Sequence, residues 1–119
     1  MAWTFNSQTP VYIQIAARLR GEIIRGVYKP NDQIPPVRTL AVIAAVNPNT
    51  VQRALTLLEE EGIIYSHTTQ GRYVTDDNAV LERARHQAAN ELIEDFLHKA
   101  RELSIERDEL ISILKEADL

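Results

Sequence analysis

Residues 37–62 of the chain read VRTLAVIAAVNPNTVQRALTLLEEEG, and this stretch decides the fold. Apolar residues recur in it at every third or fourth position, which is the spacing of amphipathic helices. Asn is a preferred N-cap residue and Pro is enriched at the first helical position, so a helix is expected to begin at Asn47-Pro48 and to run to about Glu61. Gly62 is placed to end that helix in the left-handed conformation. The stretch therefore predicts two short helices joined by a tight turn.

The residues on either side of this helix pair complete a small domain. Pro10 can occupy the first turn of a helix whose apolar positions recur until Gly26. After the helix pair, residues 63–66 and 72–75 are β-branched and aromatic segments, which predict a β-hairpin. Two helices joined by a turn and followed by a hairpin form a winged helix-turn-helix, which we expect over residues 1–76.

A polar stretch at Asp76-Asp77-Asn78 separates this domain from a second helical segment, residues 77–119. Apolar residues recur there along about 26 positions, which corresponds to a helix about 39 Å long. Ser104 is expected to be the N-cap of a further short helix. The predicted fold class is therefore mainly α with a small β-hairpin, in which a winged helix-turn-helix is followed by a two-helix segment.

The two C-terminal helices cannot bury their own apolar faces, so they need a partner surface. Symmetric association of two chains is the simplest solution, and we expect a homodimer. The alternative is that the long helix packs back on its own winged domain. The candidate dimerisation residues are Leu81, Ala84, Ala88, Leu92, Phe96, Leu103, Leu110 and Leu114.

The composition is that of a globular protein, with 45% hydrophobic and 25% charged residues among 119. The chain has no cysteine, which excludes disulfides, thiolate metal sites and a cysteine nucleophile. No apolar run approaches the roughly 18 residues of a membrane span, and the first ten residues do not resemble a secretory signal. We therefore expect a cytoplasmic protein that contacts no membrane.

The net charge of −4 argues, for the chain as a whole, against a nucleic-acid binder. The charge is unevenly distributed, however. Residues 1–75 contain seven basic and five acidic side chains, a net charge of +2, whereas residues 76–119 contain six basic and twelve acidic ones, a net charge of −6. A mildly basic N-terminal domain is thus followed by an acidic segment, and the N-terminal domain remains compatible with DNA.

The helix that begins at Asn47-Pro48 carries small polar side chains at its start, as major-groove recognition requires. Arginines near it can contact the phosphate backbone. The candidate DNA-binding residues are Arg38, Asn47, Asn49, Thr50, Gln52, Arg53, Gly71 and Arg72. Each also has a plainer interpretation: Asn47 as a structural N-cap, Gln52 and Arg53 as a solvated helix face, and Arg72 as a solubilising charge.

Catalytic motifs are missing from the sequence, which has no P-loop, nucleophile elbow or metal-ligand cluster. The pairs Glu82/His86 and Glu94/His98 have a spacing that can bind a metal, but this spacing is more typical of solvated side-chain pairs. We therefore expect neither an enzyme nor a metal or cofactor site. The main alternative to a DNA-binding protein is a winged-helix module that binds only other proteins.

Nearly all of residues 10–75 is covered by three segments: PVYIQIAARLRGEIIRGVYKPNDQIPPVRTLA, VNPNTVQRALTLLEEEGIIY and QGRYVT. They closely resemble the DNA-binding domain of the GntR family of bacterial transcription regulators. The short C-terminal segment is similar to that of the YtrA-like subgroup, in which two helices dimerise in place of a ligand-binding domain. The resemblance implies sequence-specific binding to an operator. It also implies that the protein usually represses transcription, often of operons that encode ABC-type transporters. It leaves the effector ligand unknown.

The resemblance also assigns roles to individual positions. It implies DNA contacts by Arg38, Asn47, Asn49, Thr50, Gln52 and Arg53, and it makes Gly71 the wing glycine. This chain departs from the family pattern at three points. Pro36 replaces a Ser whose hydroxyl could bind phosphate, and the wing keeps one glycine where Gly-x-Gly is common. Ala45 replaces the Gly of the helix-helix turn, so a positive φ at that position would carry strain.

Overall fold

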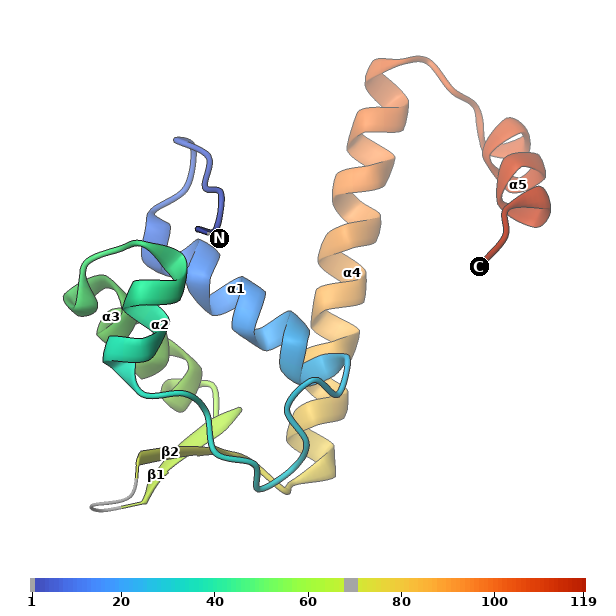
Figure 1. Ribbon diagram of the computed structural model, residues 1–119. Coiled ribbons are helices and arrows are strands. Elements are labelled where there is room, and N and C mark those ends of the chain that lie inside the picture. Colours follow the sequence, from blue (N-terminus) through green and yellow to red (C-terminus); the bar gives the residue numbers. More distant parts are fainter. Residues whose placement is uncertain (1, 68–70) are drawn as a thin grey trace. The chain divides into compact units, whose positions relative to one another are not determined.

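The computed structural model of the chain describes residues 2–67 and 71–119 (Figure 1). It is mainly helical with one antiparallel hairpin, which confirms the predicted fold class. The elements in order are α1 (Val11–Ile24), α2 (Val37–Ala44), α3 (Pro48–Glu60), β1 (Ile64–His67), β2 (Gly71–Val74), α4 (Asn78–Glu102) and α5 (Arg107–Glu116). Among the described residues, no helix is both long and apolar enough to cross a bilayer.

The chain divides into two compact units, Met1–Arg85 and His86–Leu119. The division lies within α4, whereas the polar residues of the sequence suggested a boundary between residues 76 and 77. The physical reason is that Val80, Leu81 and Ala84, on the first two turns of α4, pack against the core of the first unit. The first unit thus contains the winged helix-turn-helix together with the start of α4.

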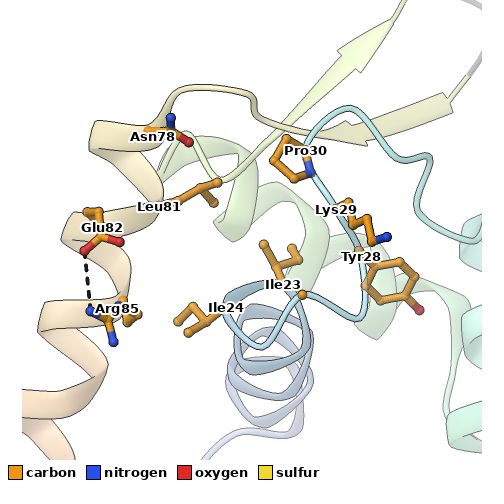
Figure 2. A pocket seen from close by; sticks show the side chains of 10 residues that line it. Ile23, Ile24, Tyr28, Lys29, Pro30, Asn78, Leu81, Glu82 and Arg85 are labelled. Carbon is orange, nitrogen blue, oxygen red and sulfur yellow. Dashed lines mark ion pairs between the residues drawn. The ribbon is translucent and has the colours of Figure 1, made fainter.

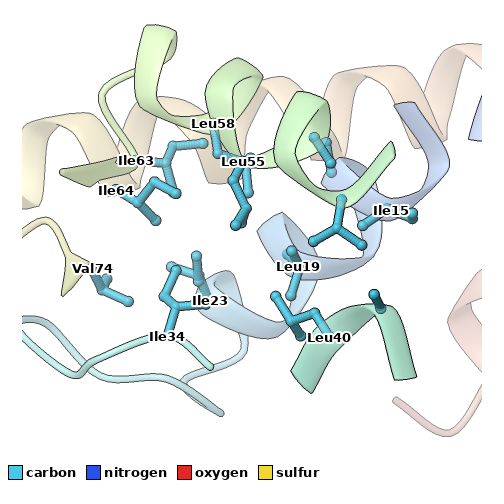
Figure 3. Packing of buried hydrophobic residues seen from close by; sticks show 14 residues of the cluster. Ile15, Leu19, Ile23, Ile34, Leu40, Leu55, Leu58, Ile63, Ile64 and Val74 are labelled. Atoms are coloured by element: carbon cyan, nitrogen blue, oxygen red, sulfur yellow. The ribbon is translucent and has the colours of Figure 1, made fainter. Parts of the chain in front are cut away.

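The core of the first unit is a single cluster of buried apolar side chains that come from α1, α2, α3 and the hairpin (Figure 3). The predicted stripe of α3 lies entirely within it, because Val51, Ala54, Leu55 and Leu58 are at most 1% exposed. Ile34, from the segment between α1 and α2, is also buried there. Burial of this stripe fixes which side of α3 faces the solvent.

α1, α2 and α3 end in the same way, with a residue of positive φ after the last turn. These residues are Gly26 (φ 83°), Ala45 (φ 59°) and Gly62 (φ 77°). The following N–H then donates to the carbonyl five positions back, in the bonds Val27 N–Glu22 O (2.9 Å), Val46 N–Ala41 O (3.0 Å) and Ile63 N–Leu58 O (3.1 Å). This is the Schellman motif, which satisfies carbonyls that the helix leaves unpaired. Among these three residues, Ala45 alone carries a Cβ atom.

The wing hairpin pairs β1 with β2 in antiparallel register, from Ile64 opposite Val74 to His67 opposite Gly71. Residues 68–70, where the sequence predicts the hairpin turn, lie outside the described residues. The segment before α2 extends this sheet on the other side of β2. Three backbone bonds of 2.9 Å make this pairing: Asn31 N–Val74 O, Val74 N–Asp32 O and Ile34 N–Arg72 O. The wing is thereby anchored to the connection between α1 and α2.

In the second unit, the prediction that Ser104 is an N-cap is wrong. Ser104 has φ 57° and ends α4 in another Schellman motif, in which Ile105 N donates to Ala100 O at 3.0 Å. Ala100 is buried, which favours this ending because the motif usually brings together apolar residues at these two positions. The N-cap of α5 is Glu106, whose side chain makes no capping bond.

The replacement Ala45→Gly is expected to stabilise the first unit. A left-handed conformation costs an L-residue about 1 to 2 kcal/mol, part of which is offset by the larger unfolded-state entropy of Gly. We therefore expect the free energy of unfolding, measured by urea denaturation, to rise by about 0.5 to 1 kcal/mol.

The control for this change is Ala17→Gly, because Ala17 is exposed within α1 and has helical geometry. It should lower the free energy of unfolding by about 1 kcal/mol. Equal destabilisation by both replacements would show that Ala45 carries no strain.

Candidate nucleic-acid interface

Asn47 begins α3 as its N-cap, as the sequence predicts. Its side-chain oxygen accepts a hydrogen bond of 2.8 Å from Asn49 N, and Pro48 occupies the first helical position. The Asn47 carbonyl accepts from Thr50 N at 3.0 Å. The structural role of Asn47 is thus confirmed, and its side-chain oxygen is engaged within the protein.

The side of α3 opposite its buried stripe is polar. Asn49, Gln52 and Arg53 are exposed, and Thr50 is half-buried. In the sequence, no acidic residue occurs between Asp32 and Glu59. The first half of α3 therefore forms a polar, acid-free surface with both donors and acceptors, and we call Asn49, Thr50, Gln52 and Arg53 the recognition face.

Two arginines of the helix-turn-helix, Arg38 and Arg53, have different surroundings. Arg38 is exposed in the first turn of α2. The guanidinium carbon of Arg53 lies 3.9 Å from the centroid of the Tyr12 ring, which comes from the first turn of α1. This cation–π contact was not predictable from the sequence, because it joins residues of two helices that are far apart in the chain.

Two of the three acidic residues at the end of α3, Glu59 and Glu61, are paired with arginines. Glu61 accepts two bonds from Arg20, at 2.9 and 2.8 Å. Glu59 accepts from the Arg72 guanidinium and, at 3.1 Å, from the Ser66 hydroxyl. Arg72 therefore links β2 to the end of α3, a structural role that the sequence did not reveal.

Gly71 begins β2 with φ 97°, a conformation that an L-residue rarely adopts. A Cβ atom at this position would also lie 3.0 Å from Nε2 of Gln33. Both observations explain why the wing has glycine here, whether or not it touches DNA.

The first unit also contains a cleft of about 270 Å³ where the end of α1, the following loop and the start of α4 meet (Figure 2). Ile23, Ile24 and Leu81 form its apolar part, and the ion pair of Glu82 with Arg85, at 3.6 Å, lies on the α4 side. Burial raises the pKa of the Tyr28 hydroxyl, and the Glu22 carboxylate raises it further.

The predicted dimerisation residues fall into two groups. Leu81 and Ala84 pack against the core of the first unit, so they contribute to its fold. The other six lie in the second unit, where Ala88 and Leu110 are half-buried and Leu92, Phe96, Leu103 and Leu114 are exposed. The candidate dimerisation residues do not include four further exposed apolar residues of this unit: Ile93, Ile111, Ile113 and Leu119.

Some of the acidic and histidine residues of α4 form ordinary helical ion pairs. His98 Nε2 lies 2.8 Å from Glu102 Oε1, so His98 has a carboxylate partner one turn after it. Lys99 Nζ lies 3.0 Å from Asp95 Oδ2. All four side chains are largely exposed, and such pairs contribute little to stability.

Comparison with known proteins identifies a family along most of the first unit. The family model described as bacterial regulatory proteins, gntR family, matches residues 11–74. The HTH-type transcriptional repressor YtrA of Bacillus subtilis (strain 168) is 33% identical over 112 residues, which cover 93% of this chain and 86% of that protein. The HTH-type transcriptional regulator YhcF of the same organism is 30% identical over 111 residues, covering 93% and 92%.

A solved structure matches the whole fold. A GntR family transcriptional regulator from Listeria monocytogenes superposes with a TM-score of 0.85 at 35% sequence identity, and the match covers 96% of this chain and all of that one. These relatives confirm the expectation of a transcription regulator rather than an enzyme. The chain belongs to the GntR family of bacterial transcription regulators, and its helix-turn-helix is a DNA-binding domain.

Proposed function

We propose that this protein is a cytoplasmic homodimeric repressor that binds a palindromic operator and silences an operon, such as one for an ABC-type transporter. In this proposal, residues 1–76 bind the DNA and residues 77–119 form the dimer. The observation that carries the proposal is the recognition face, an exposed, acid-free polar surface at the start of α3. The similar protein YtrA is named a repressor, which supports repression rather than activation.

The recognition face has the chemistry to distinguish base pairs in a major groove. An amide such as that of Gln52 can bond to both N6 and N7 of adenine, and Asn49 offers the same pattern one turn earlier. Thr50 can donate, accept or touch a thymine methyl group. Sequence preference is therefore assigned to these three residues.

Phosphate contacts are assigned to the arginines and to backbone N–H groups. Arg38 and Arg53 carry the charge, and the start of α3 attracts phosphate through its N–H groups, with Asn47 at that end. Glu59 and Glu61 are at the other end of α3 and are paired with arginines, which limits their repulsion of phosphate. Gly71 and Arg72 are included as wing contacts on the strength of the family pattern.

The dimer is supported by the apolar surface of the second unit. Eight large apolar side chains are exposed there among 34 residues, and contiguous exposed apolar surface marks interaction sites. We assign the interface to Ala88, Leu92, Phe96, Leu103, Leu110 and Leu114, joined by Ile93, Ile111 and Ile113. A symmetric dimer would place two α3 helices in successive major grooves, about 34 Å apart.

Arg38→Ala tests the phosphate contacts. Binding to duplex DNA from upstream of the protein's own gene, measured by fluorescence anisotropy across a salt series, should weaken at least about tenfold. The slope of log K against log salt concentration should fall by about one unit per chain, since one phosphate contact is lost.

The control for Arg38→Ala is Arg25→Ala, which removes an exposed arginine beyond the end of α1 and should leave affinity and slope unchanged. If both variants bind like the wild type, Arg38 does not contact DNA. If the wild-type protein does not bind at low salt, the chain is instead a protein-interaction module.

Gln52→Ala tests base recognition. In a competition assay with single-base-pair variants of the bound duplex, it should lose discrimination at one position per half-site, equivalent to about 1 to 3 kcal/mol. The salt slope should remain that of the wild type, because no charge is removed. Discrimination that is unchanged at every position would contradict the proposed groove contact.

Phe96→Glu tests the dimer. It places a carboxylate in the proposed apolar interface, so sedimentation equilibrium should give the single-chain mass of 13.5 kDa, where the wild type should give twice that mass. The control is Gln87→Glu, which adds a carboxylate on the opposite side of α4. Gln87 precedes Phe96 by nine residues, which correspond to about 180° of net rotation around the helix. This replacement should leave the mass of the dimer unchanged, and a dimeric Phe96→Glu protein would exclude this interface.

A further inference from the structure

We propose that Tyr12 is a positioning residue for DNA binding, because its ring holds the Arg53 guanidinium on the recognition face without neutralising its charge. The inference rests on the proposed function, in which Arg53 contacts DNA, and extends it to a residue outside the helix-turn-helix.

The contact joins a fixed ring to an exposed cation. Tyr12 is half-buried in the first turn of α1 and packs against the core, so its ring has little freedom. Arg53 is exposed, and its guanidinium carbon is 3.9 Å from the ring centroid. This separation is well inside the range of about 6 Å over which an aromatic face attracts a cation.

The position of Arg53 on α3 makes its conformation matter. Arg53 follows Asn49 by four residues, so the two side chains lie on the same face one turn apart. A free arginine side chain has many rotamers, and a complex with DNA would have to select one of them. A guanidinium already held against a ring loses less conformational entropy on binding.

An aromatic partner has a different electrostatic effect from a carboxylate. Arg20 and Arg72 are held by Glu61 and Glu59, so each of these arginines brings a compensating negative charge with it. The Tyr12 ring is neutral, and a stacked guanidinium keeps its N–H groups at its edge for hydrogen bonds. Tyr12 can therefore order Arg53 and leave its charge available to phosphate.

The experiment is a double-mutant cycle on DNA affinity. The wild-type protein first selects a duplex from a random pool, and the affinity of each variant for that duplex is measured. Arg53→Ala should weaken binding at least about tenfold. Tyr12→Leu should weaken it about threefold to tenfold, through loss of the ordered guanidinium, whereas Tyr12→Phe should stay within about twofold of the wild type because it keeps the ring. The double variant Tyr12→Leu/Arg53→Ala should be no weaker than Arg53→Ala alone.

Tyr28→Leu is the matched control, because Tyr28 is also a half-buried tyrosine packed against the core of the first unit. It should bind DNA like the wild type, and thermal unfolding should show all variants folded at the assay temperature. If Tyr12→Leu does not fold, Tyr12→Met replaces it as the non-aromatic variant and carries the same expectation.

The outcomes separate the inference from the proposed function. The inference would be overturned if Arg53→Ala weakened binding and Tyr12→Leu did not. It would also be overturned if the effects of the two replacements were additive. Either result would leave the proposed function intact. Tyr12→Phe as weak as Tyr12→Leu would also overturn it, since the hydroxyl would then be the binding group. A wild-type protein that selects no duplex would contradict the proposed function, and the inference with it.

Discussion

Burial of four side chains on α3 determines which side of this helix faces the solvent. Val51, Ala54, Leu55 and Leu58 are in effect fully removed from water. Full burial of a Val or Leu side chain is worth about 1.5 to 3 kcal/mol, so a rotation of α3 that exposed two of them would cost several kcal/mol. Because a helix turns by about 100° per residue, their burial leaves Asn49, Gln52 and Arg53 outside. The exposure of the recognition face thus follows from the burial of the opposite side of α3 in the core.

The three residues between α2 and α3 each meet a separate requirement of this arrangement. Ala45 takes the left-handed conformation that ends α2, and Val46 is half-buried with its N–H bonded to Ala41 O. Asn47 caps α3. A turn this short leaves little freedom in the relative placement of Arg38 and the start of α3. Ala45 therefore adopts an unfavourable φ because the short turn between α2 and α3 requires a left-handed residue at this position.

The features that the sequence predicted well are those with local causes. The start of α3 at Asn47-Pro48, its end at Gly62 and the buried stripe all depend on residues within a few positions of each other. Ser104 shows the limit of such signals: serine is a favoured N-cap, but Ser104 ends α4 in the left-handed conformation, an ending that the burial of Ala100 favours.

Features that depend on distant residues were not predictable in the same way. The pairing of Asn31 and Ile34 with β2 joins segments about forty residues apart in the chain. The same holds for Arg53 with Tyr12 and for Arg20 with Glu61. Arg72 is closer in sequence to its partner Glu59, but the ion pair requires the hairpin to bring β2 beside the end of α3. No spacing rule identifies such pairs before the fold is known.

These pairs determine which arginines of the first unit have a carboxylate partner. By count, its first 75 residues have only two more basic than acidic side chains. The fold places Arg20 and Arg72 against Glu61 and Glu59, and it places Arg53 against a neutral ring, with Arg38 exposed. Of the three carboxylates at the end of α3, those of Glu59 and Glu61 are paired with arginines, whereas the first half of α3 carries Arg53 and no acidic residue. For the proposed operator binding a small net charge is therefore sufficient, because the local field depends on where the unneutralised arginines lie.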